Sequence, residues 1–242
     1  LETYREDYDL ALRAAERLAA LGQFAGTVAH EMRNPLAVLS TSSHLLRRHA
    51  GDQPDLLRHV DRVERQVAIC GQIVDDLLAL ARDRAPSFED VSLQPLIEFA
   101  WAQLPTSPHT LSLTMAESSL SLRADPGQLR QVLVNLLQNA TQAMSDGGVV
   151  SVHVGPAPDD ELGRESVRIR VEDAGAGFSP DALEHLFEPL YTTKARGIGL
   201  GLPLCQRVVA KHRGKLTAGN REPHGGRVDI VLPLTQPSQG GT

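Results

Sequence analysis

A single histidine with polar neighbours is the first group in this chain whose type and spacing suggest chemistry. It lies in the run Ala29-His30-Glu31-Met32-Arg33-Asn34-Pro35-Leu36. Glu31 can orient the imidazole of His30 or take its proton, which makes the other ring nitrogen a better nucleophile. Asn34 lies one helical turn further on, where its amide can hold a water or an acyl phosphate. The alternative is an ordinary solvated histidine.

Two asparagines in a later helical pattern suggest a metal ligand. Asn135 and Asn139 are four residues apart and therefore share one helix face. An amide oxygen can coordinate Mg²⁺, which keeps waters and substrate phosphates as its other ligands. Plain surface polarity is the competing interpretation of the same pair.

Two glycine-rich motifs complete a possible nucleotide pocket. In Asp173-Ala174-Gly175-Ala176-Gly177, a carboxylate at a strand end can accept a hydrogen bond from an adenine amino group, although a simple turn has the same composition. Gly197-Ile198-Gly199-Leu200-Gly201-Leu202 opens a helix, and backbone N–H groups there suit phosphate. Lys194 adds a positive charge nearby. The spacing matches neither a Rossmann fingerprint nor a Walker A loop. A nucleophilic histidine with an ATP pocket predicts an enzyme that phosphorylates its own histidine.

The histidine is positioned by a heptad pattern. Apolar or small residues recur in steps of three and four at Leu18, Leu21, Ala25, Val28, Met32, Pro35, Leu39, Ser42 and Leu46, and again at Leu56, Val60, Val63, Val67, Cys70, Val74, Leu77 and Ala81. This spacing predicts a helical hairpin with a polar turn at 51–54, and two hairpins should pair into a homodimeric four-helix bundle. His30 then points away from the seam. Pro35 predicts a kink near His30, or else the end of the helix.

The pattern changes near Val91. Segments 111–115 and 120–122 alternate like a β-hairpin, and Asp125-Pro126 should begin a helix that runs to about residue 144. Strands are expected at 149–154, 167–171, 215–218 and 227–231, with a helix at 200–211. The mixture predicts an α+β two-layer sandwich. We expect a coiled-coil extension (1–17), a dimerisation and phosphotransfer domain (18–85), a linker (86–90), a catalytic ATP-binding domain (91–235) and a flexible tail (236–242).

Composition narrows the function classes. The net charge of −6 and the lack of a Lys/Arg block argue against nucleic-acid binding. Two cysteines make no disulfide framework and favour a reducing compartment; Cys70 should be core and Cys205 buried. No apolar run reaches the roughly 20 residues that span a bilayer, so no membrane contact is expected within this stretch. The chain begins at Leu1 without Met, so we expect a cytoplasmic piece of a longer protein that is either soluble or membrane-anchored.

These motifs resemble, in the same order, those of the sensor histidine kinases. The similar segments are residues 30–36 (H-box), 135–140 (N-box), 173–177 (G1 box), 187–194 (F-box and the start of the ATP lid) and 197–202 (G2 box). The resemblance spans nearly all of the chain. The short lid and the run 139–144 are similar to the nitrogen-regulation and zinc-responsive branch. Leu190 departs from the many relatives that have an aromatic residue there.

The resemblance implies an ATP-binding domain of the GHKL type, in which Asn139 holds Mg²⁺ and Asn135 supports it. The implied nucleotide contacts are Asn135, Asn139, Gln142, Asp173, Gly175, Gly177, Lys194, Gly197, Gly199, Leu200, Gly201 and Leu202. It implies autophosphorylation of His30, within one chain or across the dimer, and transfer to an aspartate of a response-regulator receiver domain. It also implies that Glu31 and Asn34 assist dephosphorylation of that regulator.

Two alternatives remain. A GHKL ATPase would release free phosphate and form no phosphoprotein, while a weakly catalytic scaffold would only bind a regulator. Intact Asn139, Asp173 and the 197–201 loop argue against the scaffold.

Overall fold

The computed structural model describes residues 32–51, 53–81, 84–105, 108–117, 120–157, 165–194 and 199–235. These form two compact units that divide between residues 84 and 85. Three predicted site residues, His30, Glu31 and Gly197, lie outside the described ranges, as do the predicted coiled-coil extension and tail.

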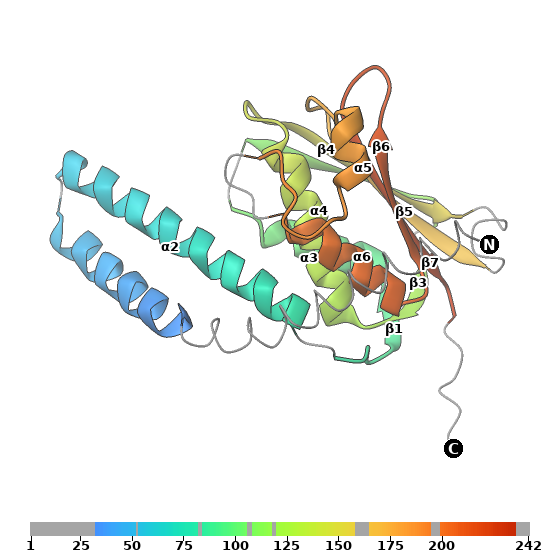
Figure 1. The fold of residues 1–242 in the computed structure, drawn as a ribbon, viewed down its shortest axis with the longest axis horizontal. Coiled ribbons are helices and arrows are strands. Elements are labelled where there is room, and N and C mark those ends of the chain that lie inside the picture. Colours follow the sequence, from blue (N-terminus) through green and yellow to red (C-terminus); the bar gives the residue numbers. More distant parts are fainter. Residues whose placement is uncertain are drawn as a thin grey trace, which may run out of the picture. The chain divides into compact units, whose positions relative to one another are not determined.

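The described part of the first unit consists of two helices joined by a turn (Figure 1). One covers residues 32–49, and the second is α2 (Pro54–Ala81). Gly51, in the turn between them, has φ of 50°, a left-handed conformation that costs glycine little. The first helix is continuous through Pro35, so the alternative that the helix ends there is wrong. Across the hairpin, Nε of Arg47 donates to Oε1 of Glu64 at 3.2 Å.

Only part of the predicted heptad seam, including Val60 and Val74, lies on the inner face of the hairpin. Ser43, Ala50, Val60 and Val74 are buried, and Leu36 packs against Val74. The exposed large apolar residues on the seam positions of the two helices are Met32 (46% exposed), Leu39 (49%), Leu46 (54%), Leu56 (37%) and Val63 (44%). One chain therefore buries one face of each helix and leaves an adjacent apolar face exposed. Cys70, which the seam pattern predicts to be core, is also exposed in one chain.

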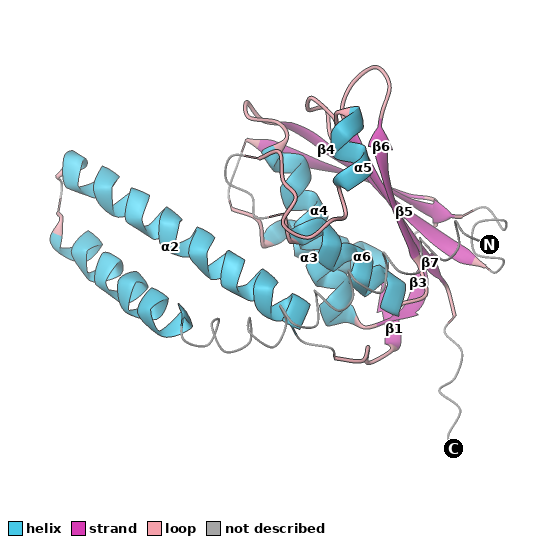
Figure 2. Ribbon diagram, in the orientation of Figure 1, coloured by secondary structure: helices cyan, strands magenta, loops and turns pink. Residues whose placement is uncertain are grey.

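The second unit is an α+β sandwich with two layers (Figure 2). Its five-stranded sheet has the order β2 (His109–Met115), β4 (Gly148–Pro156), β5 (Ser166–Glu172), β7 (Gly226–Pro233), β6 (Lys215–Asn220). The β2–β4 pair is parallel and the other pairs are antiparallel. The helical layer contains α3 (Leu93–Ala102), α4 (Pro126–Gln142) and α6 (Gly201–Lys211), and the short α5 (Pro180–His185) lies nearby. A separate two-stranded sheet pairs β1 (Glu89–Ser92) with β3 (Ser121–Ala124).

Alternation along the strands and the apolar stripe of α4 build the core. Val150 and Val152 of β4 are fully buried, as are Leu133 and Leu137 of α4. Burying an aliphatic side chain of this size stabilises the fold by roughly 1.5–3 kcal/mol each. The core thus holds α4 firmly against the sheet, and α4 carries both candidate asparagines.

The structure corrects one prediction of topology. Segments 111–115 and 120–122 do not form a hairpin with each other: β2 pairs in parallel with β4, and β3 pairs with β1. Alternation predicts strands but does not say which strands become neighbours, because the partner is chosen by the whole sheet. The α3 helix was also missed, and strand pairing already begins at Glu89, inside the segment expected as linker.

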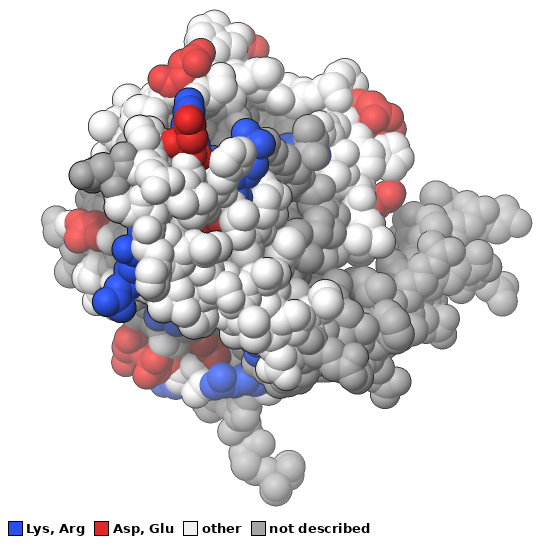
Figure 3. Space-filling model, turned by 90° about the vertical axis from the view of Figure 1, so that its left-hand side faces the viewer, with Lys and Arg blue, Asp and Glu red and all other residues white. Residues whose placement is uncertain are grey.

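The start of α4 was predicted correctly. Asp125 is the N-cap, its Oδ1 accepts the Gln128 N–H at 3.0 Å, and Pro126 occupies the first turn. No helix in the described part of the chain is long and apolar enough to span a membrane. On the face drawn in Figure 3, basic and acidic residues are interspersed among uncharged ones.

Candidate nucleotide-binding site

The asparagine pair on α4 lies beside the first turn of α6. Asn135 is 7% exposed, so surface polarity does not explain it. A Cβ added to Gly201 would lie 3.8–4.0 Å from the side-chain amide of Asn135. Within the described chain, Nδ2 of Asn135 is buried without a hydrogen-bond partner. An orphaned buried amide is uncommon in folded proteins and points to a site that a polar ligand completes.

Asp173 is held directly after β5 by two backbone donors. Its side chain accepts the N–H of Gly175 at 2.8 Å and the N–H of Gly226 at 3.1 Å, both at Oδ1. The residue is 8% exposed. A Cβ on Gly226 would come within 2.7 Å of Oδ2 of Asp173, and one on Gly175 within 2.5 Å of the carbonyl oxygen of Ala143. Glycine is therefore required at both positions to keep this carboxylate oriented.

Asn220 completes this loop and was not identified from the sequence. Its Oδ1 accepts the N–H of Phe178 at 2.7 Å, and its Nδ2 donates to the carbonyl of Phe178 at 2.9 Å. Gly177 has φ of 72°, and a Cβ there would lie 2.6 Å from Oδ1 of Asn220. Because Asn220 ends β6, 42 residues along the chain from Phe178, no local signal could have revealed the pair.

Lys194 reaches the polar face of α4. Its Nζ donates to Oδ1 of Asn139 at 2.7 Å and to Oε1 of Gln142 at 2.9 Å. Partial desolvation of the ammonium lowers the pKa of Lys194, and the charge of Asp173 acts in the opposite direction. Residues predicted from two separate motifs therefore meet in the structure, around a point where amide oxygens face a cation.

A backbone hydrogen bond joins the two ends of the segment that contains Lys194. The Leu190 N–H donates to the carbonyl of Gly199 at 3.0 Å. Gly199 has φ of 72°, and a Cβ there would lie 2.1 Å from the carbonyl oxygen of Tyr191. Tyr191 donates its hydroxyl to Oδ2 of Asp181 on α5 at 2.9 Å, which raises the pKa of Tyr191. These contacts fix both ends of the segment between Leu190 and Gly199, which we call the lid segment.

The N-terminus of α6 is built to receive an anion. Leu200 is the N-cap, its side chain is buried, and no side chain caps the helix. Uncapped N–H groups in a first helical turn carry a partial positive charge and suit phosphate. Together with the unpaired Nδ2 of Asn135 beside them, these N–H groups fit the phosphates of a nucleoside triphosphate. The amide oxygen of Asn139 fits Mg²⁺.

Other predicted residues are placed as follows. Leu202 lies in the first turn of α6, half-buried. Asn34 is exposed on the helix of residues 32–49, in the other unit. Cys205 is buried, as predicted. The described residues contain no group of three or more His, Cys, Asp or Glu side chains that could hold a metal ion.

Two family models match the chain. Residues 124–236 match the "Histidine kinase-, DNA gyrase B-, and HSP90-like ATPase" model, and residues 20–86 match the "His Kinase A (phospho-acceptor) domain" model. The ATPase model alone also covers proteins like DNA gyrase B and HSP90. The phosphoacceptor model in the same chain decides in favour of a histidine kinase. The chain belongs to the sensor histidine kinases.

Curated histidine kinases of bacteria are similar over almost all of this chain. AtoS of Escherichia coli is 31% identical over 96% of the chain and 38% of its own length. ZraS of Salmonella typhimurium is 33% identical over 96% of the chain and 50% of its own length. Sporulation kinase E of Bacillus subtilis is 30% identical over 97% of the chain and 31% of its own length. The chain therefore spans half or less of these three relatives.

Solved histidine kinases share the fold. The kinase ThkA, in complex with the response regulator protein TrrA, aligns with 99% of this chain and 69% of its own at a TM-score of 0.66 and 25% identity. The nucleotide-free catalytic domain of ThkA aligns with 62% of this chain and 97% of its own at a TM-score of 0.55 and 27% identity. The two-unit architecture is thus that of known histidine kinases.

Proposed function

We propose that this chain is the kinase core of a two-component sensor: it binds ATP with Mg²⁺, phosphorylates its own His30, and passes the phosphoryl group to an aspartate of a response regulator. The observation that carries this is that α4 meets Lys194 at Asn139 and the first turn of α6 at Asn135, in a chain whose residues 20–86 match a phosphoacceptor domain.

The nucleotide side of the proposal rests on fixed donors and acceptors. Asp173 is held by two backbone N–H groups, which orients its carboxylate to accept a hydrogen bond from an adenine amine. Asn135 and the N–H groups of α6 provide donors for phosphate oxygens, and Asn139 provides the amide oxygen for Mg²⁺. Mg²⁺ would neutralise phosphate charge. Pre-oriented groups of this kind accelerate phosphoryl transfer mainly by positioning and electrostatics.

The phosphoacceptor chemistry is assigned to His30. An imidazole nitrogen forms the bond to the γ-phosphorus of ATP, the bond from that phosphorus to the bridging oxygen breaks, and ADP leaves. Glu31 takes or orients the imidazole proton. In the reverse activity, Glu31 and Asn34 hold the water that hydrolyses the acyl phosphate of the regulator.

The exposed seam supports a homodimer. Seam residues such as Leu39 and Leu46 are about half exposed in one chain, and a second hairpin that covers them would complete a four-helix bundle. The response regulator would then dock on this bundle, close to the phosphohistidine. The expected location of the kinase core is the cytoplasm.

The second candidate, a GHKL ATPase, uses the same pocket but leaves His30 unmodified. The two functions differ in where the γ-phosphate of ATP goes: an ATPase releases it as free phosphate, and a histidine kinase transfers it to the protein. Incubation with γ-labelled ATP and Mg²⁺ should label the protein, and the label should be lost in acid and retained in base, because a phosphoramidate is acid-labile.

The controls identify the residue. His30→Gln should carry no label, whereas His44→Gln, at an exposed histidine on the helix of residues 32–49, should be labelled like the wild type. Free phosphate without labelled protein, equal in the wild type and His30→Gln, would establish the ATPase instead. Label that persists in His30→Gln would overturn the assignment of His30.

A further inference from the structure

A buried histidine at the C-terminal end of α6 connects α6 to α4, the two helices that form the nucleotide site. His212 follows the last residue of α6 and is 1% exposed. Its Nδ1 lies 2.8 Å from the carbonyl oxygen of Val208, which can only accept, so Nδ1 carries the proton. Its Nε2 then accepts the backbone N–H of Asp125, the N-cap of α4, at 3.0 Å. The two partners require the neutral ring in one tautomer.

The same junction holds the segment that leads into the unit. Oδ2 of Asp125 accepts the N–H of Ser87 at 2.9 Å, while Oδ1 caps α4. The ring of Phe88 meets the ring of His212 edge-on, with centroids 5.4 Å apart and an interplanar angle of 77°. One buried point therefore connects the end of α6, the start of α4 and the segment 87–88.

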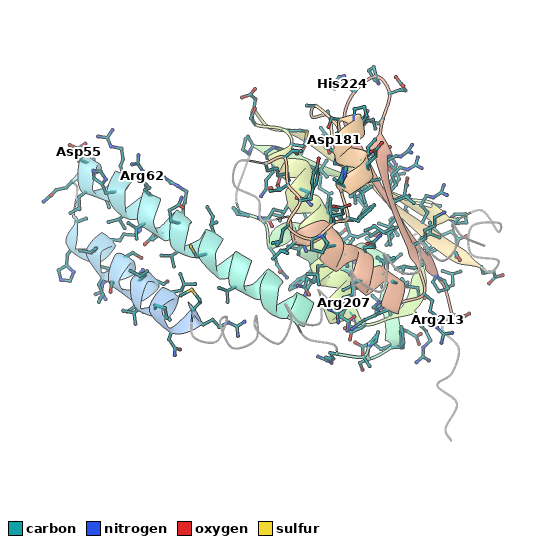
Figure 4. All side chains as sticks on the ribbon, viewed as in Figure 1. Asp55, Arg62, Asp181, Arg207, Arg213 and His224 are labelled. Carbon is teal, nitrogen blue, oxygen red and sulfur yellow. The ribbon has the colours of Figure 1, made fainter. Side chains whose placement is uncertain are left out.

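The junction lies at the ends of the helices remote from the nucleotide residues. Asp125 and Asn135 are ten residues apart, or about 15 Å along a helix, and Gly201 and His212 are separated by a similar length. Gly201 lies beside Asn135 in the middle of α4, so α6 meets α4 near both of its own ends. Figure 4 shows Arg213, the residue after His212, at the end of the unit away from Asp181 on α5.

We propose that His212 is a positioning residue of the nucleotide site: it sets the placement of α6 against α4 and couples that placement to the segment Ser87–Phe88. This inference rests on the proposed function. Because the first turn of α6 faces phosphate and α4 carries Asn135 and Asn139, a shift of one helix along the other would separate the two halves of the site. Release of the segment 87–88 would loosen the same junction, so nucleotide affinity and the order of that segment should change together.

Protonation supplies a readout specific to this role. Burial lowers the pKa of His212; the Val208 carbonyl and the carboxylate of Asp125 act to raise it, and the charge of Lys211 lowers it further. An imidazolium cannot accept from Asp125, so protonation breaks the junction. Since the folded pKa is below the unfolded one, the stability that neutral His212 contributes is present above the unfolded pKa, about 6.5, and is lost as the pH falls from there through the folded pKa.

The test compares two variants of His212, Gln and Asn, whose side-chain amides differ in length. In His212→Gln, Oε1 can take the place of Nε2 as acceptor for Asp125, whereas in His212→Asn the amide reaches only the position of Nδ1. We expect His212→Asn to weaken the binding of a fluorescent ATP analogue and to speed hydrogen exchange at the amides of Asp125 and Ser87 by about tenfold each, the scale expected when a buried donor loses its partner. His212→Gln should restore both, and His153→Asn, at an exposed position on β4, should change neither.

The pH profile completes the test with the full chain. Wild-type affinity should fall more steeply below pH 6.5 than the affinity of His212→Gln, and protonation of the nucleotide affects both proteins equally. If the wild type binds nucleotide but both variants match it in affinity and exchange, the inference is overturned; equal losses in both variants would also overturn it, because they would indicate packing rather than the acceptor. A wild-type chain that binds no nucleotide would instead contradict the proposed function.

Discussion

The ammonium of Lys194 donates to Oδ1 of Asn139 at 2.7 Å, and the two residues are 55 positions apart in the sequence. The same ammonium contacts Gln142, one turn further along α4. Lys194 belongs to the lid segment and Asn139 to the helix that is anchored in the core. The contact therefore places a cation against the amide oxygen that we propose as the Mg²⁺ ligand, and it relates the position of the lid to the polar face of α4.

Lys194→Gln should weaken the binding of ATP more than that of ADP. In the proposed site, the substitution would remove a positive charge beside the terminal phosphate and leave the contacts to the adenine unchanged. An exposed charge contact is worth about 1 kcal/mol or less, and more when it is partly desolvated, so a loss of several-fold in ATP affinity is expected. Titration of both nucleotides checks this, with Lys215→Gln, exposed on β6, as the control.

Asp173→Asn should lower nucleotide affinity by tenfold or more while the chain stays folded. The asparagine oxygen can still accept from Gly175 and Gly226, but its NH₂ group would face the adenine amine in place of an acceptor. A hydrogen bond to a charged group contributes about 1.5–3 kcal/mol. Calorimetric titration and a melting curve together check this prediction, and unchanged affinity would remove Asp173 from the adenine site.

Gly199→Ala should disrupt the base of the lid. An alanine there would have φ of 72° and a Cβ 2.1 Å from the Tyr191 carbonyl oxygen, so the 190–199 pairing must open. Backbone strain of this kind costs of order 1–3 kcal/mol. We expect faster hydrogen exchange at Leu190 and weaker ATP binding. Gly71→Ala, which has no atom within 4 Å of the added Cβ, should behave like the wild type in both measurements.

Leu39→Glu should separate the homodimer. Leu39 is 49% exposed on the seam, and a dimer interface there would bury the new charge without a partner. Sedimentation should show a shift from dimer to monomer, while the inner face around Val74 keeps each hairpin helical by circular dichroism. Arg48→Glu, at an exposed position off the seam, serves as the charge control. A dimer that persists at micromolar concentration in Leu39→Glu would place the interface elsewhere.

Asn34→Ala should reduce dephosphorylation of the response regulator more than autophosphorylation. The amide of Asn34 is exposed on its helix and is proposed to hold a water against the acyl phosphate, a task that transfer to His30 does not need. Both activities are measured on the same preparation with a phosphorylated regulator. Equal loss of the two activities would argue that Asn34 has no role specific to dephosphorylation.

The start of α4 shows what local signals can predict. An Asp N-cap followed by Pro determines where the helix begins, because both act on the backbone within one turn. The glycines at 175 and 199 were predicted from the sequence as nucleotide contacts, and the structure adds that a Cβ at either position would clash with the backbone of Ala143 or Tyr191. In contrast, strand alternation in 111–122 suggested a hairpin, and the structure pairs the two strands with β4 and β1 instead.

The sequence by itself determined the identity of the chemical groups, their order along the chain and the local turns and caps that hold them. Only the tertiary structure decided which distant groups meet: Lys194 with Asn139, Asn220 with Phe178, and His212 with Asp125. It also decided that seam residues such as Leu39 and Leu46 stay exposed in one chain, while another seam residue, Val74, packs against Leu36. The physical reason is that propensity and capping act over a few residues, whereas burial and long-range hydrogen bonds depend on how all the elements pack together.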